Sequence, residues 1–259
     1  MGRKKGGGGV KRLIVMIMAL VLLTGCGSQM PPLEKNPYGP EDFSREDGVM
    51  TCLAGSARMG VDVSSYQEQI DWETAAAAGV EFAIIRIGYR GYTEGGIIED
   101  RYARVNLEAA KAAGIEVGAY FFSQAISTEE AAEEARWCVD FLKDYELDLP
   151  LAFDWEHVGD PQARTAGIRN RTLLTDCAET FLGIAREAGY GTMLYFNTYQ
   201  SRLLFNLRQL QDHDFWLAQY TDTMDFSYAV DLWQYTETGT VDGIPGMVDI
   251  DLWLRGAAE

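Results

Sequence analysis

Short apolar runs alternate with amphipathic stretches of helical period from residue 59 onward, and this alternation constrains the fold more than any other feature. Residues 82–88 are almost continuously apolar, as expected for a strand that is covered on both faces. Helical stretches end at Gly79, Gly114 and Gly189, which suit C-terminal caps. Ser127 with Glu130 makes a capping box that predicts the start of a long helix, and a shorter helix is predicted near residues 199–210. Strands that alternate with helices over this length predict a parallel sheet.

The pattern changes after about residue 210. Three further apolar runs, at residues 215–220, 232–235 and 248–252, are separated by turn-rich segments without a helical period. About eight strands in all predict an α/β fold, an irregular TIM-like β/α barrel that lacks some outer helices in its C-terminal part. An open doubly wound sheet is the alternative, but no G-x-G-x-x-G sequence follows a strand to support a dinucleotide-binding form.

The first residues have the composition of an export signal. Basic residues precede an apolar run at residues 13–23 that is too short to span a bilayer comfortably. The run ends in Leu23-Thr24-Gly25-Cys26, which has the form of a bacterial lipobox. We predict a lipoprotein signal peptide at residues 1–25, lipidation of Cys26, and a location at the extracellular face of the bacterial cell membrane. A plain secretory signal or an uncleaved anchor is the alternative.

Residues 26–58 predict a lipid-anchored flexible tether, because they are rich in proline and show no helical or strand period. Removal of residues 1–25 takes away five basic residues and no acidic residue, so the formal net charge falls from −17 to −22. A domain this acidic is a poor partner for nucleic acid, whose phosphates are neutralised by Lys and Arg. We expect a monomer that meets the membrane through the lipid on Cys26.

Three cysteines remain besides Cys26, and this odd number argues against a complete disulfide framework. Cys138 and Cys177 lie within apolar helical stripes, which predicts small buried side chains. The two histidines, His157 and His213, have no partner at metal-ligand spacing. The sequence therefore predicts no metal site and calls for no cofactor.

Residues 149–156 combine an apolar run with two carboxylates. In an extended strand Asp154 and Glu156 share one face, about 7 Å apart along the backbone, and their repulsion raises the pKa of at least one of them. A proton donor beside a charge-stabilising carboxylate is the equipment for breaking a glycosidic bond. Two solvated acids in a loop after a strand are the alternative for so short a motif.

In a β/α barrel, functional side chains gather at the carboxyl ends of the strands. Acids, amides and aromatic residues recur at these predicted ends, a combination that suits a saccharide cleft. Core packing is the alternative for each aromatic residue taken singly. The candidates are Asp62, Tyr120, Phe122, Asp154, Glu156, Tyr195, Asn197, Trp216, Gln219, Tyr220, Gln234, Tyr235, Asp249 and Asp251.

Several ordered motifs from Gly60 to about Leu254 together resemble the family 25 glycoside hydrolases, the N-acetylmuramidase type of lysozyme. The motifs are Gly60-Val61-Asp62-Val63-Ser64, Ile70-Asp71-Trp72, Phe82-Ala83-Ile84-Ile85-Arg86, Gly118-Ala119-Tyr120-Phe121-Phe122, Asp154-Trp155-Glu156, Trp216-Leu217-Ala218-Gln219-Tyr220, Trp233-Gln234-Tyr235 and Val248-Asp249-Ile250-Asp251. The resemblance implies a catalytic β/α barrel at residues 59–259. It also implies cleavage of the β-1,4 bond between N-acetylmuramic acid and N-acetylglucosamine in peptidoglycan.

The resemblance further implies that the catalytic acids are Asp62, Asp154, Glu156 and Asp249. We expect Glu156 to be the general acid, while Asp154 either attacks the anomeric carbon or orients the 2-acetamido group of the substrate. Asp251 departs from the family, which usually has Asn there, so either Asp249 or Asp251 faces the cleft. The expected substrate-binding residues are Tyr120, Phe122, Tyr195, Asn197, Trp216, Tyr220, Gln234 and Asp251.

Two other functions fit parts of the pattern. A barrel that grips glycan without cutting it is the first alternative, although all four cleft acids are present. An amidase or deacetylase acting on the same polymer is the second, but those chemistries usually need a metal or a Cys/His pair that this sequence does not offer.

Overall fold

The structure is a computed structural model that describes residues 1–2, 30–46, 48–55 and 57–254. Cys26 and residues 3–25 of the predicted signal peptide lie outside the described residues. The chain divides into two units, residues 1–30 and residues 31–259, and the barrel belongs to the second. Across the described ranges, none of the helices combines the length and the apolar character that a bilayer crossing requires.

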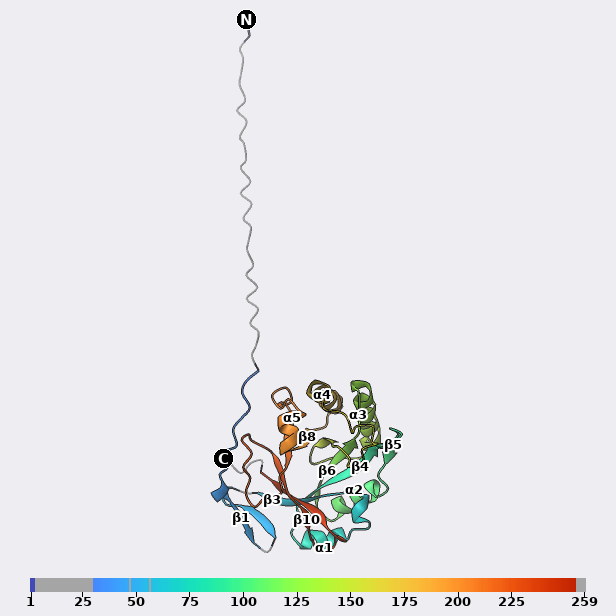
Figure 1. Cartoon of the computed structure of the whole chain (residues 1–259), viewed down its shortest axis with the longest axis vertical. Coiled ribbons are helices and arrows are strands. Elements are labelled where there is room, and N and C mark those ends of the chain that lie inside the picture. Colours follow the sequence, from blue (N-terminus) through green and yellow to red (C-terminus); the bar gives the residue numbers. More distant parts are fainter. Residues whose placement is uncertain (3–29, 47, 56, 255–259) are drawn as a thin grey trace. The chain divides into compact units, whose positions relative to one another are not determined.

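Eight strands close a barrel in the second unit (Figure 1). Neighbours from β3 through β10 run parallel, whereas β11 runs antiparallel to both β10 and β3 and completes the ring. The predicted irregular β/α barrel is therefore confirmed. The ring consists of β3 (Arg58–Val63), β4 (Phe82–Arg90), β6 (Glu116–Ser123), β7 (Leu151–Trp155), β8 (Thr192–Asn197), β9 (Asp214–Ala218), β10 (Leu232–Gly239) and β11 (Val248–Trp253), and β5 (Ile97–Glu99) pairs with β4 outside it.

Helices pack outside the first strands of the ring: α2 lies against β4 and β6, α3 against β6, and α4 against β7 and β8 (Figure 1). The Ser127 side chain accepts a hydrogen bond from the backbone N–H of Glu130, which starts α3 where the capping residues predict. The predicted helix near residues 199–210 is shorter than expected. The helical elements are η1 (Pro40–Asp42), η2 (Ser65–Gln67), α1 (Trp72–Ala77), α2 (Ala103–Ala112), α3 (Thr128–Leu142), α4 (Arg171–Glu187) and α5 (Thr198–Leu203).

Part of the segment at residues 26–58, where a flexible tether was expected, is folded in the structure. β1 (Phe43–Glu46) and β2 (Val49–Cys52) form an antiparallel hairpin. Phe43 is buried and meets Trp233 of β10 edge-on, with 5.0 Å between ring centroids. The hairpin thus takes an outer position on β10. Strands of four residues are too short to give the periodic signal on which the sequence prediction depends.

The barrel interior changes from apolar to polar along its axis. Its floor is an apolar cluster that includes Phe82, Leu232 and Trp253. Gly60 has to lack a side chain here, since a Cβ atom would lie 2.3 Å from the Phe82 ring. Outside the sheet, Cys138 and Cys177 are fully buried and free, as their apolar stripes predict. The polar side chains of the interior therefore lie toward the opposite rim of the barrel.

Candidate active site

Four acids far apart in the sequence line one cavity of about 280 Å³ at the rim where the parallel strands end. Asp62 comes from β3, Asp154 from β7, Glu156 from the residue after β7, and Asp249 from β11. Asp249 lies near the start of its strand, yet it reaches the same rim because β11 is antiparallel and pairs Asp249 directly with Asp62. The structure therefore brings together all four predicted catalytic acids.

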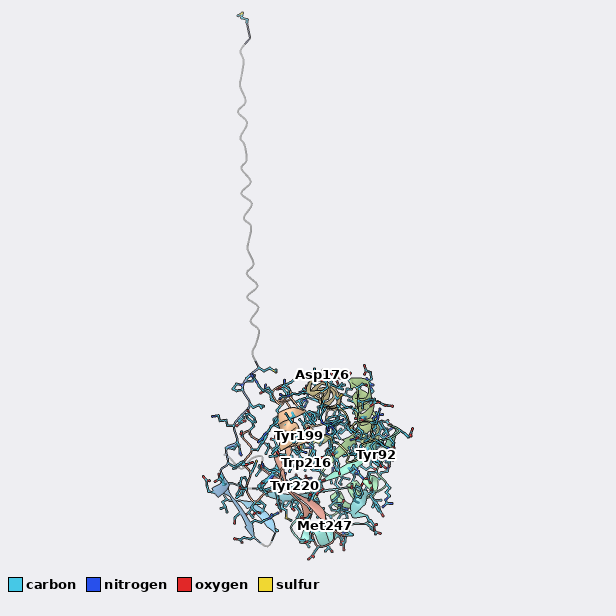
Figure 2. All side chains as sticks on the ribbon, viewed as in Figure 1. Tyr92, Asp176, Tyr199, Trp216, Tyr220 and Met247 are labelled. Carbon is cyan, nitrogen blue, oxygen red and sulfur yellow. The ribbon has the colours of Figure 1, made fainter. Side chains whose placement is uncertain are left out.

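Six of the predicted substrate-binding residues also line this cavity, and Figure 2 labels Trp216 and Tyr220 among them. Trp216 is buried, whereas the ring of Tyr220 is about half exposed and is available to a ligand. The six are Tyr120, Phe122, Tyr195, Trp216, Tyr220 and Gln234, and the wall residues that sequence reasoning missed are Val63, Ser64, Tyr66, Gln67, Arg86 and Glu237.

Two predicted substrate-binding residues do not reach the cavity wall. Asn197 ends β8 and caps α5, where its Oδ1 accepts a hydrogen bond from the backbone N–H of Gln200 at 3.0 Å. Asp251 is fully buried one inward-facing position below Asp249, and its Oδ1 accepts a hydrogen bond from Trp216 Nε1 at 2.8 Å. Asp249 is thus the acid of β11 that faces the cavity.

Burial and mutual repulsion hold protons on the cavity acids. Burial raises the pKa of Glu156 to about 7, with further contributions from Asp249 and Glu237. Burial and the Glu237 charge raise the pKa of Asp249 to about 6. Burial and the Glu156 charge raise the pKa of Asp154 well above its usual range, although the nearby Arg86 charge opposes this. Near neutral pH the site thus holds exchangeable protons beside ionised carboxylates.

Arg86 is the one cation among the cavity-lining residues in the described part of the chain. Its Nε donates to Asp100 Oδ2 at 2.9 Å, and its guanidinium lies 5.3 Å from the ring centroid of Tyr66. A charged residue inside the otherwise apolar run of β4 was the available sequence signal, because a buried charge needs a partner. Arg86 offsets part of the negative charge in the cavity.

Gln234 connects three walls of the cavity through hydrogen bonds. Its Oε1 accepts from the hydroxyl groups of Tyr195 at 3.1 Å and Tyr220 at 2.9 Å. Its Nε2 donates to Asp62 Oδ2 at 2.6 Å. The two tyrosines therefore fix the amide orientation that presents a donor to Asp62.

Buried amide side chains hold the segment that carries Glu156. Gln124 Nε2 donates to the Glu156 carbonyl oxygen at 2.6 Å, and Gln200 Nε2 donates to the Trp155 carbonyl oxygen at 2.6 Å. The Trp155 indole donates in turn to the Ala125 carbonyl oxygen at 3.0 Å. The backbone at the end of β7 is thus held from two sides, which positions the Glu156 carboxyl.

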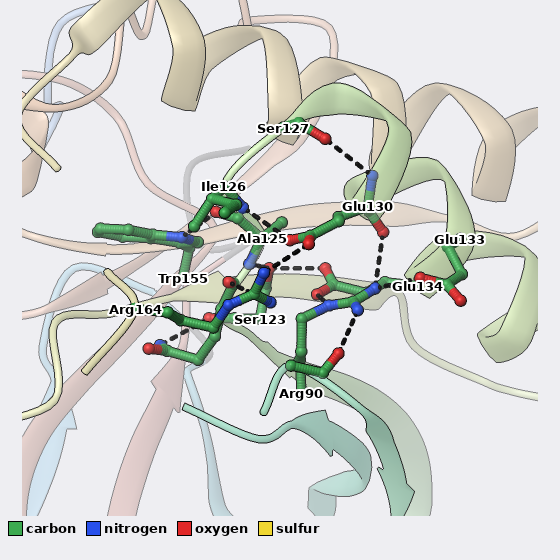
Figure 3. A network of polar contacts seen from close by, with 12 residues as sticks. Arg90, Ser123, Ala125, Ile126, Ser127, Glu130, Glu133, Glu134, Trp155 and Arg164 are labelled. Atoms are coloured by element: carbon green, nitrogen blue, oxygen red, sulfur yellow. Dashed lines mark hydrogen bonds and ion pairs between the residues drawn. The ribbon is translucent and has the colours of Figure 1, made fainter. Parts of the chain in front are cut away.

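A polar network supports the rim next to Trp155 (Figure 3). Arg90 of β4 donates from Nε to Glu134 Oε1 of α3 at 2.6 Å, and Ser123 Oγ donates to Glu134 Oε2 at 2.6 Å. Arg164 forms an ion pair with Glu130 at 2.5 Å, which connects the loop after β7 to this network. These contacts join β4, β6 and α3 behind the cavity rather than within it.

In the described ranges, no group of three or more His, Cys, Asp or Glu residues is placed to hold a metal ion. His157 Nε2 contacts the Ile168 carbonyl oxygen at 2.9 Å, and His213 Nδ1 contacts Thr192 Oγ1 at 2.7 Å. Both histidines therefore serve local hydrogen bonds.

A closed barrel whose rim brings together several carboxyl groups, some of them protonated near neutral pH, is typical of the glycoside hydrolases. Residues 61–244 match the model of the glycosyl hydrolases family 25, and the chain belongs to this family.

Two relatives and one solved structure are similar to this chain. Lysozyme M1 of Streptomyces globisporus is 28% identical over 216 residues, which cover 79% of this chain and 70% of that protein. The protein YegX of Escherichia coli K12 is 28% identical over 211 residues, which cover 77% of this chain and 70% of YegX. The modular autolysin LytC of Streptococcus pneumoniae, solved with a synthetic peptidoglycan ligand, has the same fold at a TM-score of 0.70 and 21% identity. The match covers 82% of this chain but only 52% of LytC, so the chain spans about half the length of that autolysin.

Proposed function

We propose that this protein is a peptidoglycan hydrolase that cleaves the β-1,4 bond between N-acetylmuramic acid and N-acetylglucosamine. The observation that carries the proposal is the convergence of Asp62, Asp154, Glu156 and Asp249 on one cavity. Membership of the glycosyl hydrolases family 25 and the likeness to lysozyme M1 support the same substrate.

Glu156 is the general acid in this proposal. A pKa of about 7 keeps about half of the Glu156 carboxyls protonated at neutral pH, ready to donate to the leaving glycosidic oxygen. Asp154 is the second carboxylate, and Arg86 favours its ionised form. Asp154 either attacks the anomeric carbon or orients the 2-acetamido group of the substrate as an internal nucleophile.

The remaining wall residues bind and orient the sugar. Asp62, fixed by Gln234, accepts hydrogen bonds from sugar hydroxyl groups, and Asp249 sets the negative charge beside Glu156. The half-exposed ring of Tyr220 offers a stacking face at the edge of the cavity.

Digestion of purified peptidoglycan by the full-length protein in detergent tests the proposal. We expect new reducing ends, and mass spectrometry of the released muropeptides should find N-acetylmuramic acid at the reducing end. N-acetylglucosamine at that end would identify a glucosaminidase and contradict the bond assignment. Binding to peptidoglycan without any new reducing ends would support the non-catalytic alternative.

We also propose that the mature protein is a monomer attached to the extracellular face of the bacterial membrane through a lipid on Cys26. The lipobox and the basic and apolar segments before it support this location. Cys26→Ala should abolish incorporation of a labelled fatty acid and move the protein out of the membrane fraction. Unchanged labelling of the variant would refute the anchor.

A further inference from the structure

Asp251 is a buried carboxyl group that the proposed reaction does not use. Its side chain is 0% exposed, and it lies between Gly60 of β3 and Gln234 of β10, which are its direct neighbours on the two flanking strands. The floor of the barrel below it is apolar. An ionised carboxylate in such a place is costly unless each of its oxygens finds a donor.

Only one of the two Asp251 oxygens has such a donor. Oδ1 accepts from Trp216 Nε1 at 2.8 Å, whereas Oδ2 has no donor within the described ranges. Asp62 lies on the neighbouring strand: β11 pairs Asp249 with Asp62 and Asp251 with Gly60, so Asp62 and Asp251 are diagonal neighbours on the inner face of the barrel, and both are buried. Two ionised carboxylates cannot hydrogen-bond to each other, so a hydrogen bond between these neighbours requires a proton.

Asp62 is almost as deeply enclosed, with 5% of its surface exposed. Its Oδ2 already accepts from Gln234 Nε2 at 2.6 Å. Gln234 cannot neutralise the charge of Asp62 and Asp251, because its amide donates a hydrogen bond to Asp62 without transferring a proton. Other titratable groups that face the pair are Asp249 of β11, Asp154 of β7, Tyr120 of β6, Tyr195 of β8 and Tyr235 of β10.

We infer that Asp62 and Asp251 share one proton in a carboxyl–carboxylate hydrogen bond, which gives the pair a single negative charge and makes Asp251 a positioning residue for Asp62. Burial and the neighbouring acids raise the pKa of both groups, which agrees with this arrangement. The shared proton is inferred from the burial of the pair, its place on neighbouring strands and the Asp251 oxygen that lacks a donor, while the positioning role rests on the proposed function.

Asn at this position would give Asp62 the same hydrogen bond without a titratable proton. Asp62 would then be ionised and the pair would again carry one negative charge. Compared with Asn at this position, Asp251 therefore keeps the hydrogen bond to Asp62 and adds one proton that the folded protein must retain.

Proton uptake on folding tests the shared proton without reference to activity. From the pH dependence of the unfolding free energy, we expect folded D251N to retain about one proton fewer than the folded wild type. We expect the same difference between D62N and the wild type. The double variant D62N/D251N should also retain about one proton fewer, because the pair holds a single proton. A loss of about two protons in the double variant, or no change in D251N, overturns the inference.

Kinetics then test the positioning role. We expect D251A to lower kcat/KM at least about tenfold, because Asp62 loses a hydrogen-bond partner, and D251N to restore most of that loss. Equal kcat/KM in D251A and wild type overturns the positioning role. An inactive wild type would instead refute the proposed function and leave the proton measurements as the test of the pair.

Discussion

Glu156→Gln separates the catalytic role of this residue from its cost to stability. The substitution keeps the size of the side chain and removes its charge and its transferable proton. The folded-state pKa of Glu156 is raised from 4.5 to about 7, so the folded protein binds more protons than the unfolded chain between these values. The stability of the wild type therefore falls as the pH rises through this range.

The size of the effect follows from the shift. At about 1.4 kcal/mol per pKa unit, a rise from 4.5 to about 7 corresponds to about 3 kcal/mol. We therefore expect the stability of Glu156→Gln relative to wild type to improve by about 3 kcal/mol between about pH 4 and about pH 8. For a domain of this size, that difference corresponds to about 6–12 °C in Tm.

Thermal or urea unfolding of both proteins across this pH range measures the difference, and release of reducing ends measures activity. Activity should fall at least about 100-fold because the general acid is lost. Glu187→Gln is a matched control, since it removes one carboxylate at an exposed position at the end of α4. A variant with full activity, or one whose stability follows the same pH dependence as wild type, would refute the reasoning.

Three other substitutions test separate parts of the structure. Phe43→Ala should destabilise the barrel by about 3 kcal/mol in urea unfolding because it removes the ring that packs on Trp233; a flexible tether would give no change. Gln234→Leu should lower kcat/KM at least about tenfold with an unchanged circular dichroism spectrum, since it breaks the hydrogen bonds to Tyr195, Tyr220 and Asp62. Wild-type kinetics in this variant would argue against the role of Gln234. Arg86→Gln should move the acidic limb of the pH–activity profile to higher pH because the Arg86 charge lowers the pKa of Asp154, and Arg86→Lys should restore it; an unmoved limb in Arg86→Gln would contradict this.

Local patterns predicted the barrel well because each strand and helix carries its own signal. The apolar run of β4 and the capping pair at the start of α3 belong to single elements, and both stand in the structure where their residues predict. The Asp154-Trp155-Glu156 motif is equally local, since alternation along one strand places both carboxyls on one side. Such features need no knowledge of the remaining chain.

The hairpin at residues 43–52 shows the limit of this reasoning. Its two strands bury few residues of their own, and their stability depends on contact with Trp233 and Tyr235 of a strand almost 200 residues away. A composition rich in proline and polar residues therefore predicted a tether, because nothing within the segment indicates the surface on which it packs.

The sequence alone determined the order of strands and helices, the family motifs and the acids available for catalysis, because these depend on neighbouring residues. Tertiary structure decided which acids meet. The antiparallel direction of β11 carries Asp249 to the rim beside Asp62 and leaves Asp251 buried below it, opposite Gly60. Strand direction and depth arise from closure of the barrel, so no pattern within residues 248–253 could reveal them.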